Sequence, residues 1–431
     1  MRVLLIATNR HHRLMSRMDA RPLPIGLAYV AGYLDPQRHQ IKCLDLMFSE
    51  DYLGDVEAAV REFQPQLVGI SLRNLSNHSY LDPQWALPST KEVIDRVRSL
   101  GNATIVCGGP AFSLLPRECF TYLGPDLGIA GDAGETFATL ADRLEVGEPS
   151  YKDLPGLVYR DGGEVVFKGA RCASSFSRPP RFQELDLPKY ASAGFGLGVL
   201  TKLGSFSYPS SASETQRESS AWRVIRPIPE VVEEVRDLRQ RLGLRKVFFI
   251  DNGFNVPLAH AKELCRALID ADLGLHWNTP LAPYGCDDEL IGLMKEAGCA
   301  LTLMGGLRGD AHDGSTLDDR LEPVAETCRK CETGDLHYTI SMTFGEPGDN
   351  RETVSRKLSF LRGLNPAMAN LRIGVSILPG TSVAKQAVAE GLVADESELI
   401  KPTFYIAPAV RDWLVDHLMA EAAGHPRWNL L

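Results

Sequence analysis

Leu67–Asn74, with the sequence LVGISLRN, is the segment that decides the fold. It reads as a short apolar strand that runs directly into a polar loop. Similar apolar strands lie on both sides of it in the first third of the chain, and an amphipathic helical segment separates each from the next. This alternation requires right-handed crossovers and predicts a parallel sheet with helices on both faces.

The first half is predicted to hold five strands and four helices. The strands are Arg2–Ala7, Gln40–Leu46, Leu67–Leu72, Ala103–Cys107 and Leu127–Ala130, and the helices are Gly26–Leu34, Val56–Phe63, Thr90–Leu100 and Glu135–Leu144. A hairpin at 154–168 and a Ser/Pro-rich linker at 171–191 follow. The fold class is α/β, with a doubly wound sheet in this half.

Polar and glycine-rich loops follow four of these strands. Ligands of such sheets bind at the carboxyl ends of the strands, where glycine admits close backbone approach and Asn, Ser or Thr can bond amides. Ordinary turn chemistry is the alternative for any single loop. Without G-x-G-x-x-G after the first strand, a dinucleotide is not expected. The predicted cofactor-binding residues are Thr8, Asn9, Ser71, Leu72, Arg73, Asn74, Ser76, Asn77, Gly108, Gly109, Pro110, Ala111, Gly131, Asp132 and Glu135.

Strand–helix alternation restarts near residue 194 and predicts a (β/α)6 partial barrel, because a closed eight-fold barrel needs about 250 residues. Its expected strands are Gly196–Lys202, Lys246–Asp251, Gly274–Asn278, Ala300–Gly305, His337–Phe344 and Leu371–Leu378. The domain boundaries are set at 1–148, 149–193 for the hairpin and linker, 194–395 for the barrel, and 396–431 for a small helical extension.

The barrel mouth supplies the candidate chemistry. Buried carboxylates there can have a raised pKa and serve as acid or base. Loop caps and turns are the alternative for each residue. The predicted catalytic residues are Asp251, Asn252, Glu346 and Tyr405, and the predicted substrate-binding residues are Asn255, Trp277, Asn278, Gly305, Phe344 and Gly345.

Composition narrows the class of protein. The net charge of -9 over 431 residues argues against a nucleic-acid surface, and no apolar run is long enough to span a membrane. No signal peptide is expected at the start of the chain. The nine cysteines are scattered through apolar segments, which indicates buried thiols and a cytoplasmic location, and the pair Cys328 and Cys331 is interpreted as incidental.

The first half resembles the cobalamin-binding domain of the cobalamin-dependent radical S-adenosylmethionine family. LVGISLRN, IVCGGPAFSLLP at 105–116 and GIAGDAGE at 128–135 carry the resemblance. It implies cobalamin as the cofactor, with residues 73–77 beneath the cobalt. The D-x-H-x-x-G motif that supplies a histidine ligand is absent, and His11 is interpreted as a loop residue. The resemblance therefore implies base-off cobalamin without a histidine ligand.

The second half resembles the radical S-adenosylmethionine part of the same family, through the segments 248–268, 290–299, 344–354, 378–393, 404–414 and 425–428. In that family the first barrel strand leads into C-x-x-x-C-x-x-C, whose thiolates hold a 4Fe–4S cluster. Here these positions are Ser205, Pro209 and Ala212, which cannot replace thiolates. A family acid that contacts S-adenosylmethionine is replaced by Leu307. We expect no metal cluster, and the resemblance leaves S-adenosylmethionine binding in doubt.

Three hypotheses for the function remain open. The first is an enzyme that uses cobalamin without a radical initiator, by methyl transfer from methylcobalamin or by polar acid–base chemistry beside the corrin, on a small-molecule biosynthetic intermediate. The second is a non-catalytic cobalamin-binding carrier, sensor or partner subunit. The third is a repurposed barrel whose cobalamin site is vestigial. The oligomeric state and the substrate are not determined by the sequence.

Overall fold

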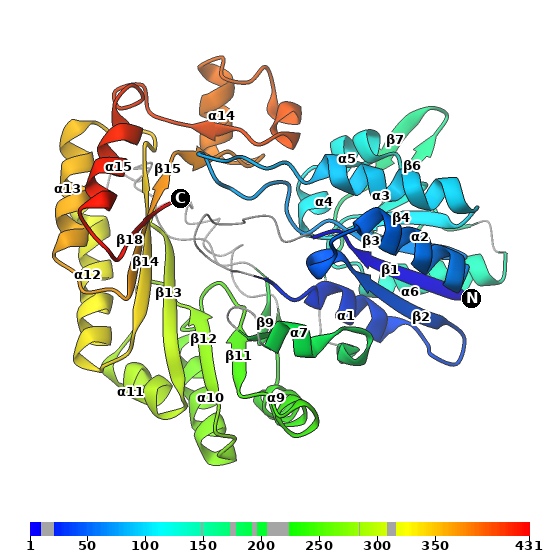
Figure 1. Ribbon diagram of the computed structural model, residues 1–431, viewed down its shortest axis with the longest axis horizontal. Helices are drawn as coiled ribbons and strands as arrows, with labels where there is room; N and C mark the ends of the chain where they lie inside the picture. The colour runs from blue at the N-terminus through cyan, green and yellow to red at the C-terminus, as the bar shows by residue number, and fades with distance from the viewer. Residues whose placement is uncertain are drawn as a thin grey trace.

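Two seven-stranded sheets, one in each half of the chain, form the framework of the structure (Figure 1). The computed structural model describes residues 1–9, 21–147, 150–172, 178–191, 196–204, 224–283, 285–307 and 316–431. Four residues discussed in the sequence analysis lie outside these ranges: the loop residue His11 and the three residues at the cluster-motif positions, Ser205, Pro209 and Ala212. No helix among the described residues is both long and apolar enough to span a membrane.

The first sheet has seven strands in the order β2-β1-β3-β4-β5-β6-β7. The first five are parallel, and the last two form the predicted hairpin as an antiparallel edge. Both faces of β1 are buried, because Leu4 and Ile6 enter one core while Val3 and Leu5 enter the other. The strands are β1 (Arg2–Ala7), β2 (Gln40–Asp45), β3 (Leu67–Ser71), β4 (Thr104–Gly108), β5 (Leu127–Ile129), β6 (Leu157–Asp161) and β7 (Glu164–Phe167).

Helices cover both faces of this sheet, as the alternation predicts. One face is packed by α1 (Ile25–Tyr33) and α6 (Gly134–Glu145). The other is packed by α2 (Tyr52–Phe63), α3 (Leu87–Leu100) and α5 (Pro116–Leu123). The short α4 (Pro110–Leu114) and α5 were not predicted, although each begins with proline, which favours the first helical position.

The second sheet also has seven strands, in the order β18-β15-β14-β13-β12-β11-β8, and all are parallel. The six predicted barrel strands are present in chain order, and β18 joins them from the segment predicted as the C-terminal extension. The expected strand 371–378 is divided at Gly374, whose φ of 68° breaks the extended backbone. The strands are β8 (Leu197–Val199), β11 (Lys246–Phe249), β12 (His276–Pro280), β13 (Cys299–Leu307), β14 (Tyr338–Phe344), β15 (Met368–Ile373) and β18 (Trp428–Leu430).

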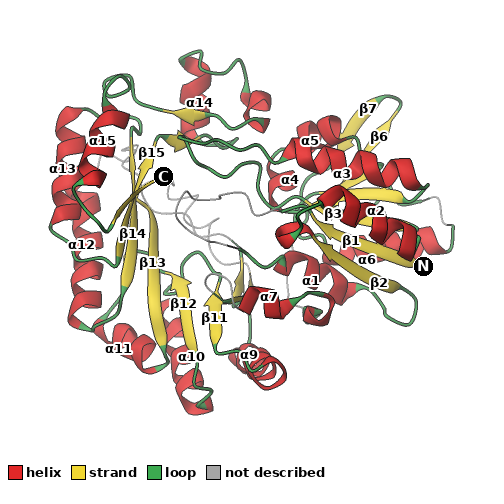
Figure 2. Cartoon of the chain, viewed as in Figure 1, coloured by secondary structure: helices red, strands yellow, loops and turns green. Residues whose placement is uncertain are grey.

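Helices line the outside of this curved sheet, and its inner face turns toward the first half (Figure 2). Lys357 on α13 lies over the Phe344 ring at 5.8 Å, so Phe344 faces the helices. Alternate residues of β14, including Ser341, therefore face the barrel interior. The helices are α9 (Ile228–Leu242), α10 (Leu258–Ala271), α11 (Asp288–Glu296), α12 (Leu317–Thr333), α13 (Arg351–Arg362) and α15 (Leu414–Ala423).

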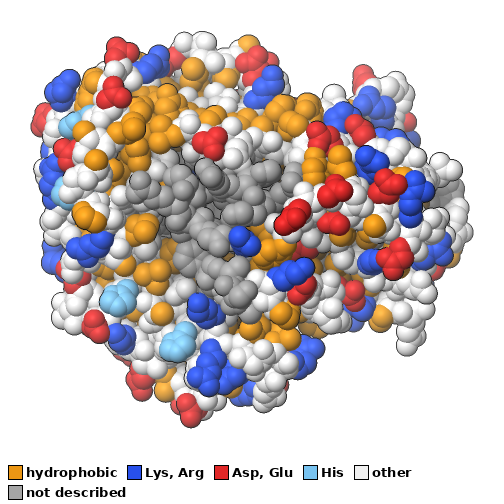
Figure 3. All heavy atoms as spheres, in the orientation of Figure 1, with side chains coloured by type: hydrophobic (Ala, Val, Ile, Leu, Met, Phe, Trp, Pro, Cys, Tyr) orange, Lys and Arg blue, Asp and Glu red, His pale blue; other side chains and the backbone are white. Residues whose placement is uncertain are grey.

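A small lobe of α14 (Ser382–Ala389), η4 (Glu396–Ile400) and the antiparallel pair β16 (Val375–Ser376) and β17 (Phe404–Tyr405) touches the loop after β3. Trp85 Nε1 donates to the Ile400 carbonyl at 2.8 Å, and the Tyr80 ring packs edge-on against Phe404. On the face drawn in Figure 3, basic and acidic side chains are mixed over both halves.

Candidate functional site

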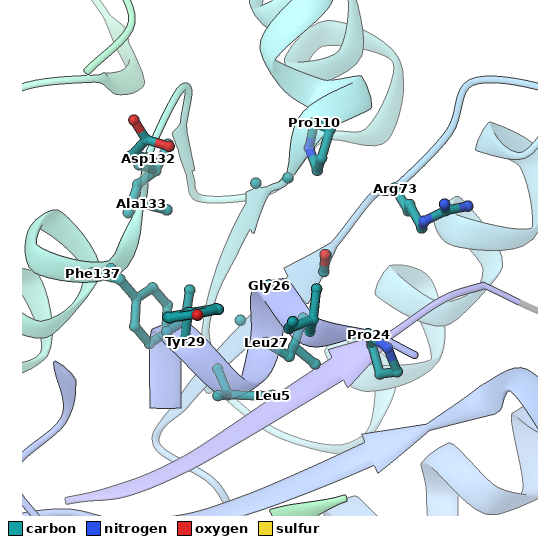
Figure 4. Close-up of a pocket in the computed structure, with 18 of the residues that line it drawn as sticks. Leu5, Pro24, Gly26, Leu27, Tyr29, Arg73, Pro110, Asp132, Ala133 and Phe137 are labelled. Atoms are coloured by element: carbon teal, nitrogen blue, oxygen red, sulfur yellow. The ribbon is translucent and has the colours of Figure 1, made fainter. Parts of the chain in front are cut away.

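A cavity of about 540 Å³ lies at the carboxyl ends of β1, β3, β4 and β5, a size typical of small-molecule and cofactor sites. Its floor is the sheet face that carries Leu5 and Gly69, together with Phe137 of α6. α1 forms the opposite wall with Gly26, Leu27, Tyr29, Val30 and Tyr33 (Figure 4). The deep part is therefore apolar, and the polar groups gather at the edge of the sheet.

Nine of the fifteen predicted cofactor-binding residues line this cavity. They are Asn9, Ser71, Arg73, Gly108, Gly109, Pro110, Gly131, Asp132 and Glu135. A second, more polar cavity of about 390 Å³ on the α3 side is lined by Thr8, Asn74, Ser76 and Asn77, and it shares Asn9 and Arg73 with the first. The sequence placed all of these residues at one edge, but β3 and its loop divide them between two cavities.

Two of the loop glycines that line the cavity also lie close to protein backbone. Gly109 has a φ of 105°, and a Cβ there would lie 2.6 Å from the Leu72 carbonyl oxygen. At Gly131, with φ 91°, a Cβ would lie 1.9 Å from the Arg171 carbonyl oxygen. Both glycines thus permit close approach of protein backbone. Leu72 and Ala111 are buried and bond through Ala111 N to Leu72 O at 3.1 Å, so they stabilise the loop.

Arg73 lies between the two cavities. In Figure 4 its guanidinium points away from the centre of the larger cavity. Burial lowers the pKa of Arg73, and with the side-chain amide of Asn74 suitably oriented, Arg73 Nη1 donates to the Asn74 oxygen at 3.2 Å. Asn77 organises the same loop, since its Oδ1 accepts from Gln84 N at 3.0 Å and its Nδ2 donates to Asp82 O at 2.7 Å.

The second half closes the cavity with three apolar side chains, Leu200, Leu203 and Ile250. Arg226 links the two halves of the chain at this place. Its Nη1 donates to the Leu200 carbonyl at 2.8 Å and lies 3.5 Å from the Tyr29 hydroxyl of α1. Its Nη2 pairs with Glu234 at 2.8 Å. The cavity is therefore built from both halves of the chain.

Sequence reasoning missed the α1 wall. The signal was available, because the sequence IGLAYVAGY of α1 has no charged residue and is apolar around the whole helix. A helix of this kind needs cover on every side. Phe137 and the sheet cover one side, and the other lines the cavity.

Asp251 does not lie free at the barrel mouth. The carboxylate is 2% exposed and accepts from the backbone N–H groups of Thr201 and Lys202, at 3.1 Å each, and from the Thr201 hydroxyl. Burial raises the pKa of Asp251, as the sequence analysis expected for a buried acid. Lys202 is also buried, which lowers its pKa to about 8, and its Nζ donates to the carbonyls of Gly253, Phe254 and Val256.

Glu346 belongs to a second buried network. Its carboxylate pairs with Lys357, which also bonds both oxygens of Asp349 at 2.8 and 2.9 Å. All three side chains are at most 4% exposed. Gly345, with φ 89°, donates its N–H to Asp349 at 2.8 Å. These bonds give Glu346 and Gly345 structural roles in the loop after β14.

Several predicted substrate-binding residues lie inside the core. Trp277 is fully buried, donates to the Ala297 carbonyl at 2.8 Å and packs edge-on against Phe249, so the prediction of a substrate contact is corrected. The strand that carries it runs on to Pro280, which moves Trp277 and Asn278 away from its end. Phe344 faces α13 and is likewise corrected.

The remaining predicted residues are spread over separate elements. Asn255 is buried and bonds Ala282 N at 2.8 Å and Ala282 O at 3.2 Å through its side chain. Tyr405 lies in the small lobe, where its hydroxyl accepts from Gln386 at 2.9 Å and donates to Glu390 at 3.2 Å. Asn252 is exposed, and Gly305 is half-buried.

The cysteines are poor candidates for thiolate ligands. Seven of the nine are buried, Cys43 is half-buried and Cys172 is exposed. Burial raises the pKa of Cys265 and of Cys331 to about 12, and it shifts the other buried thiols in the same direction. These thiols stay protonated at neutral pH.

This burial predicts how the native protein reacts with a thiol reagent. At pH 8 we expect one fast-reacting thiol per chain, Cys172, and nine after unfolding, because only the thiolate form is reactive. Titration with a chromogenic disulfide measures both numbers, and a Cys172→Ser control should remove the fast phase. Three or more fast thiols in the folded chain would contradict the assigned burial.

Comparisons with known proteins agree with this geometry. Residues 15–141 match the B12 binding domain family. An uncharacterized methyltransferase of Pyrococcus horikoshii is 23% identical over 403 residues, covering 91% of this chain and 84% of that protein. Tryptophan 2-C-methyltransferase of Streptomyces laurentii is 26% identical over 435 residues, covering 84% of this chain and 71% of that protein.

A solved structure also matches almost end to end. It is the radical S-adenosylmethionine methyltransferase TsrM of Kitasatospora setae, solved with cobalamin and a [4Fe-4S] cluster bound, with a TM-score of 0.80 and 22% identity. The match covers 100% of this chain and 93% of that one. The resemblance stated from the sequence is therefore confirmed for the B12-binding domain and for the fold.

Proposed function

We propose that this chain is a cobalamin-dependent methyltransferase that works without a 4Fe–4S cluster and acts on a small-molecule biosynthetic intermediate by non-radical chemistry. The observation that carries the proposal is the position of the larger cavity. It lies in the segment that matches the B12-binding domain and is closed by Leu200, Leu203 and Ile250 of the barrel. A cofactor bound there would face the barrel interior.

The cavity residues fit cobalamin. The apolar floor and the α1 wall suit the apolar faces of a corrin ring, and the amides and hydroxyls at the strand ends suit its peripheral amides. Asn9, Ser71, Asp132 and Glu135 would hold these amides, and Tyr29 would pack along the α1 side. When bound, methylcobalamin supplies a methyl group that a nucleophile can accept. The chain's own residues bind the cofactor and exclude water from its apolar side.

The proposed absence of a cluster rests on ligand chemistry. No cysteine occurs between residues 173 and 264, the span that contains the cluster motif positions Ser205, Pro209 and Ala212. Three thiolates would have to come from elsewhere in the chain, where seven of the nine thiols are buried and burial raises their pKa. Methyl transfer from methylcobalamin or acid–base chemistry beside the corrin needs no radical initiator.

Among the residues first considered for acid–base work, Asp251 has the best support. Burial raises its pKa, a carboxyl can serve as acid or base, and Ile250, its neighbour along the chain, lines the cavity. Its hydrogen bonds to Thr201 and Lys202 also stabilise the residues that directly follow β8. Asp251 would act by holding a proton beside the corrin.

A second candidate is a non-catalytic cobalamin-binding carrier, sensor or partner subunit. One observation favours it. The side chains of three candidate catalytic residues, Asp251, Glu346 and Tyr405, are each hydrogen-bonded or ion-paired to other groups of the protein. This is expected of residues whose main role is to stabilise the fold. Turnover of methylcobalamin in the presence of candidate acceptors separates this function from an enzyme.

The first experiment is a visible spectrum of the protein after incubation with hydroxocobalamin or methylcobalamin and desalting. We expect about one retained corrin per chain with a base-off spectrum, and bound iron and sulfide far below one cluster per chain after anaerobic reconstitution. A colourless protein would overturn cobalamin binding, and a stoichiometric cluster would overturn the cluster-free proposal, because such a cluster needs thiolate ligands.

A further inference from the structure

Arg73 carries a positive charge that no carboxylate of the described residues neutralises. Its side chain is half-buried, and burial lowers its pKa without any acidic group raising it again. Other arginines with limited exposure are paired. Arg226 is buried and pairs with Glu234 at 2.8 Å. Arg181 is half-buried and pairs with Glu184 at 2.9 Å. A charge withdrawn from water is normally paired, so Arg73 lacks the partner that its surroundings require.

The guanidinium of Arg73 lines the smaller cavity of about 390 Å³. In Figure 4 it points away from the centre of the larger cavity. A guanidinium has five N–H donors, and one of them bonds the Asn74 side-chain oxygen at 3.2 Å when that amide is suitably oriented. The remaining donors have no partner in the described part of the chain. They can therefore be used by a ligand in the cavity.

Two neutral polar side chains line the same cavity. Ser76 is 5% exposed, and its hydroxyl oxygen accepts from a backbone N–H at 3.2 Å, which leaves the hydroxyl proton to be donated. Asn9 follows Ala7 by two residues, as Arg73 follows Ser71, and Ala7 and Ser71 are in register on β1 and β3. The cavity thus offers one cation together with a hydroxyl and an amide.

The smaller cavity reaches the molecular surface. Glu92 lines it and is exposed. The carboxylate of Glu92 accepts from the Tyr52 hydroxyl and does not contribute to the pKa of Arg73, so it does not act as a counter-ion for the guanidinium. A cavity of this size can hold a small charged group together with part of the molecule that carries it.

We propose that the smaller cavity binds an oxyanion, a phosphate or carboxylate group, through the Arg73 guanidinium, with the Ser76 hydroxyl as a second donor. The planar guanidinium suits such groups because it can donate two parallel N–H bonds to them. Two sources share this chemistry, the phosphodiester of the cobalamin nucleotide tail and a separate small molecule. The proposal goes beyond the proposed function, since it concerns a second cavity and is tested without cobalamin.

The test uses inorganic phosphate, titrated by calorimetry into the full chain at constant ionic strength and without cobalamin. We expect one saturable site per chain and at least about tenfold weaker binding by Arg73→Gln, because a hydrogen bond to a charged group is lost. Arg73→Lys keeps the charge without the planar fork and should keep part of the affinity. Arg61→Gln removes an exposed arginine that pairs with Glu57, and it should bind phosphate as the wild type does.

Stability in phosphate-free buffer gives a second readout. Arg73→Gln should unfold at a temperature no lower than the wild type, because it removes a half-buried charge that lacks a counter-ion. Phosphate should then raise the unfolding midpoint of the wild type more than that of the variant. If Arg73→Gln does not fold, Ser76→Ala replaces it, and phosphate affinity that is unchanged in Ser76→Ala would then overturn the proposal.

Two corrins identify the source of the anion. Cobinamide has the corrin ring but lacks the nucleotide tail and its phosphodiester. Displacement of phosphate by cobalamin alone assigns the site to the cofactor tail, and phosphate binding that persists beside either corrin assigns it to a separate molecule. Displacement by both corrins, the lack of a saturable site, or affinity unchanged in Arg73→Gln overturns the inference. Failure to retain any corrin would count against the proposed function and would leave the phosphate result standing.

Discussion

Replacing Gly26 with tryptophan should abolish the retention of cobalamin while the protein stays folded. Gly26 lies in the first turn of α1 and lines the larger cavity, and a Cβ there would meet no atom of the described residues within 4 Å. Replacing a glycine within a helix should not lower helix stability, because glycine is itself unfavourable there. An indole ring in this space would occupy the volume that the corrin needs. We expect affinity for cobalamin to fall at least about 100-fold, or about 2.8 kcal/mol.

Gly292 provides the matched control. It lies within α11 and is exposed, and a Cβ there would also meet no atom within 4 Å in the described part of the chain. Gly292→Trp should retain corrin as the wild type does, and both variants should unfold at temperatures close to the wild-type value. A base-off spectrum of normal intensity in Gly26→Trp would show that the cofactor binds somewhere other than this cavity.

Replacing Lys357 with methionine should destabilise the protein by about 3–5 kcal/mol, the cost of removing one partner from a buried ion pair. Lys357 is 3% exposed and bonds Glu346, Asp349 and the Thr343 carbonyl. Methionine fills a similar volume but leaves two buried carboxylates without a cation. Chemical denaturation at pH 7 measures the loss of unfolding free energy.

The pH dependence has a definite sign. Burial alone would lower the pKa of Lys357, but Glu346 and Asp349 raise it above the ordinary value. A lysine with a raised pKa contributes its full stability below the unfolded pKa, near 10.4, and loses it only as the pH rises through the folded pKa. The difference between wild type and variant should therefore be constant from about pH 7 to pH 9.

Two further variants complete the test. Adding Glu346→Gln and Asp349→Asn to Lys357→Met should recover much of the loss, because no buried charge then remains. Lys42→Met removes a lysine from an exposed pair with Glu62 and should cost less than about 1 kcal/mol. A loss for Lys357→Met as small as that for Lys42→Met would mean that the triad contributes little to folding.

The local sequence predicted the presence and order of most helices and strands, but it did not predict where the strands end. The strand after Gly274 was expected to end at Asn278, but pairing with β13 carries it to Pro280. β18 was missed because three residues are too short to show a period, and it forms only because its backbone completes hydrogen bonds at the edge of β15. Such strands depend on a partner that is distant in the sequence.

The candidate site divides in the same way. Asp251 and Glu346 were chosen because acids at strand ends can act in catalysis, yet the structure gives both of them bonds to groups within the protein. The partners Thr201 and Lys202 are 50 and 49 residues away from Asp251. A pattern of neighbouring residues could not have shown that these carboxylates already have hydrogen-bond partners within the protein.

The sequence by itself determined two properties of this protein. The order of apolar and amphipathic segments specified the two sheets, because periodicity is local. At the positions that the resemblance assigns to the cluster motif the sequence has Ser205, Pro209 and Ala212, and none of these residue types supplies a thiolate. The tertiary structure alone decided where the cavity lies and that α1 forms its wall. These features depend on which surfaces meet, and that is settled only when distant segments pack together.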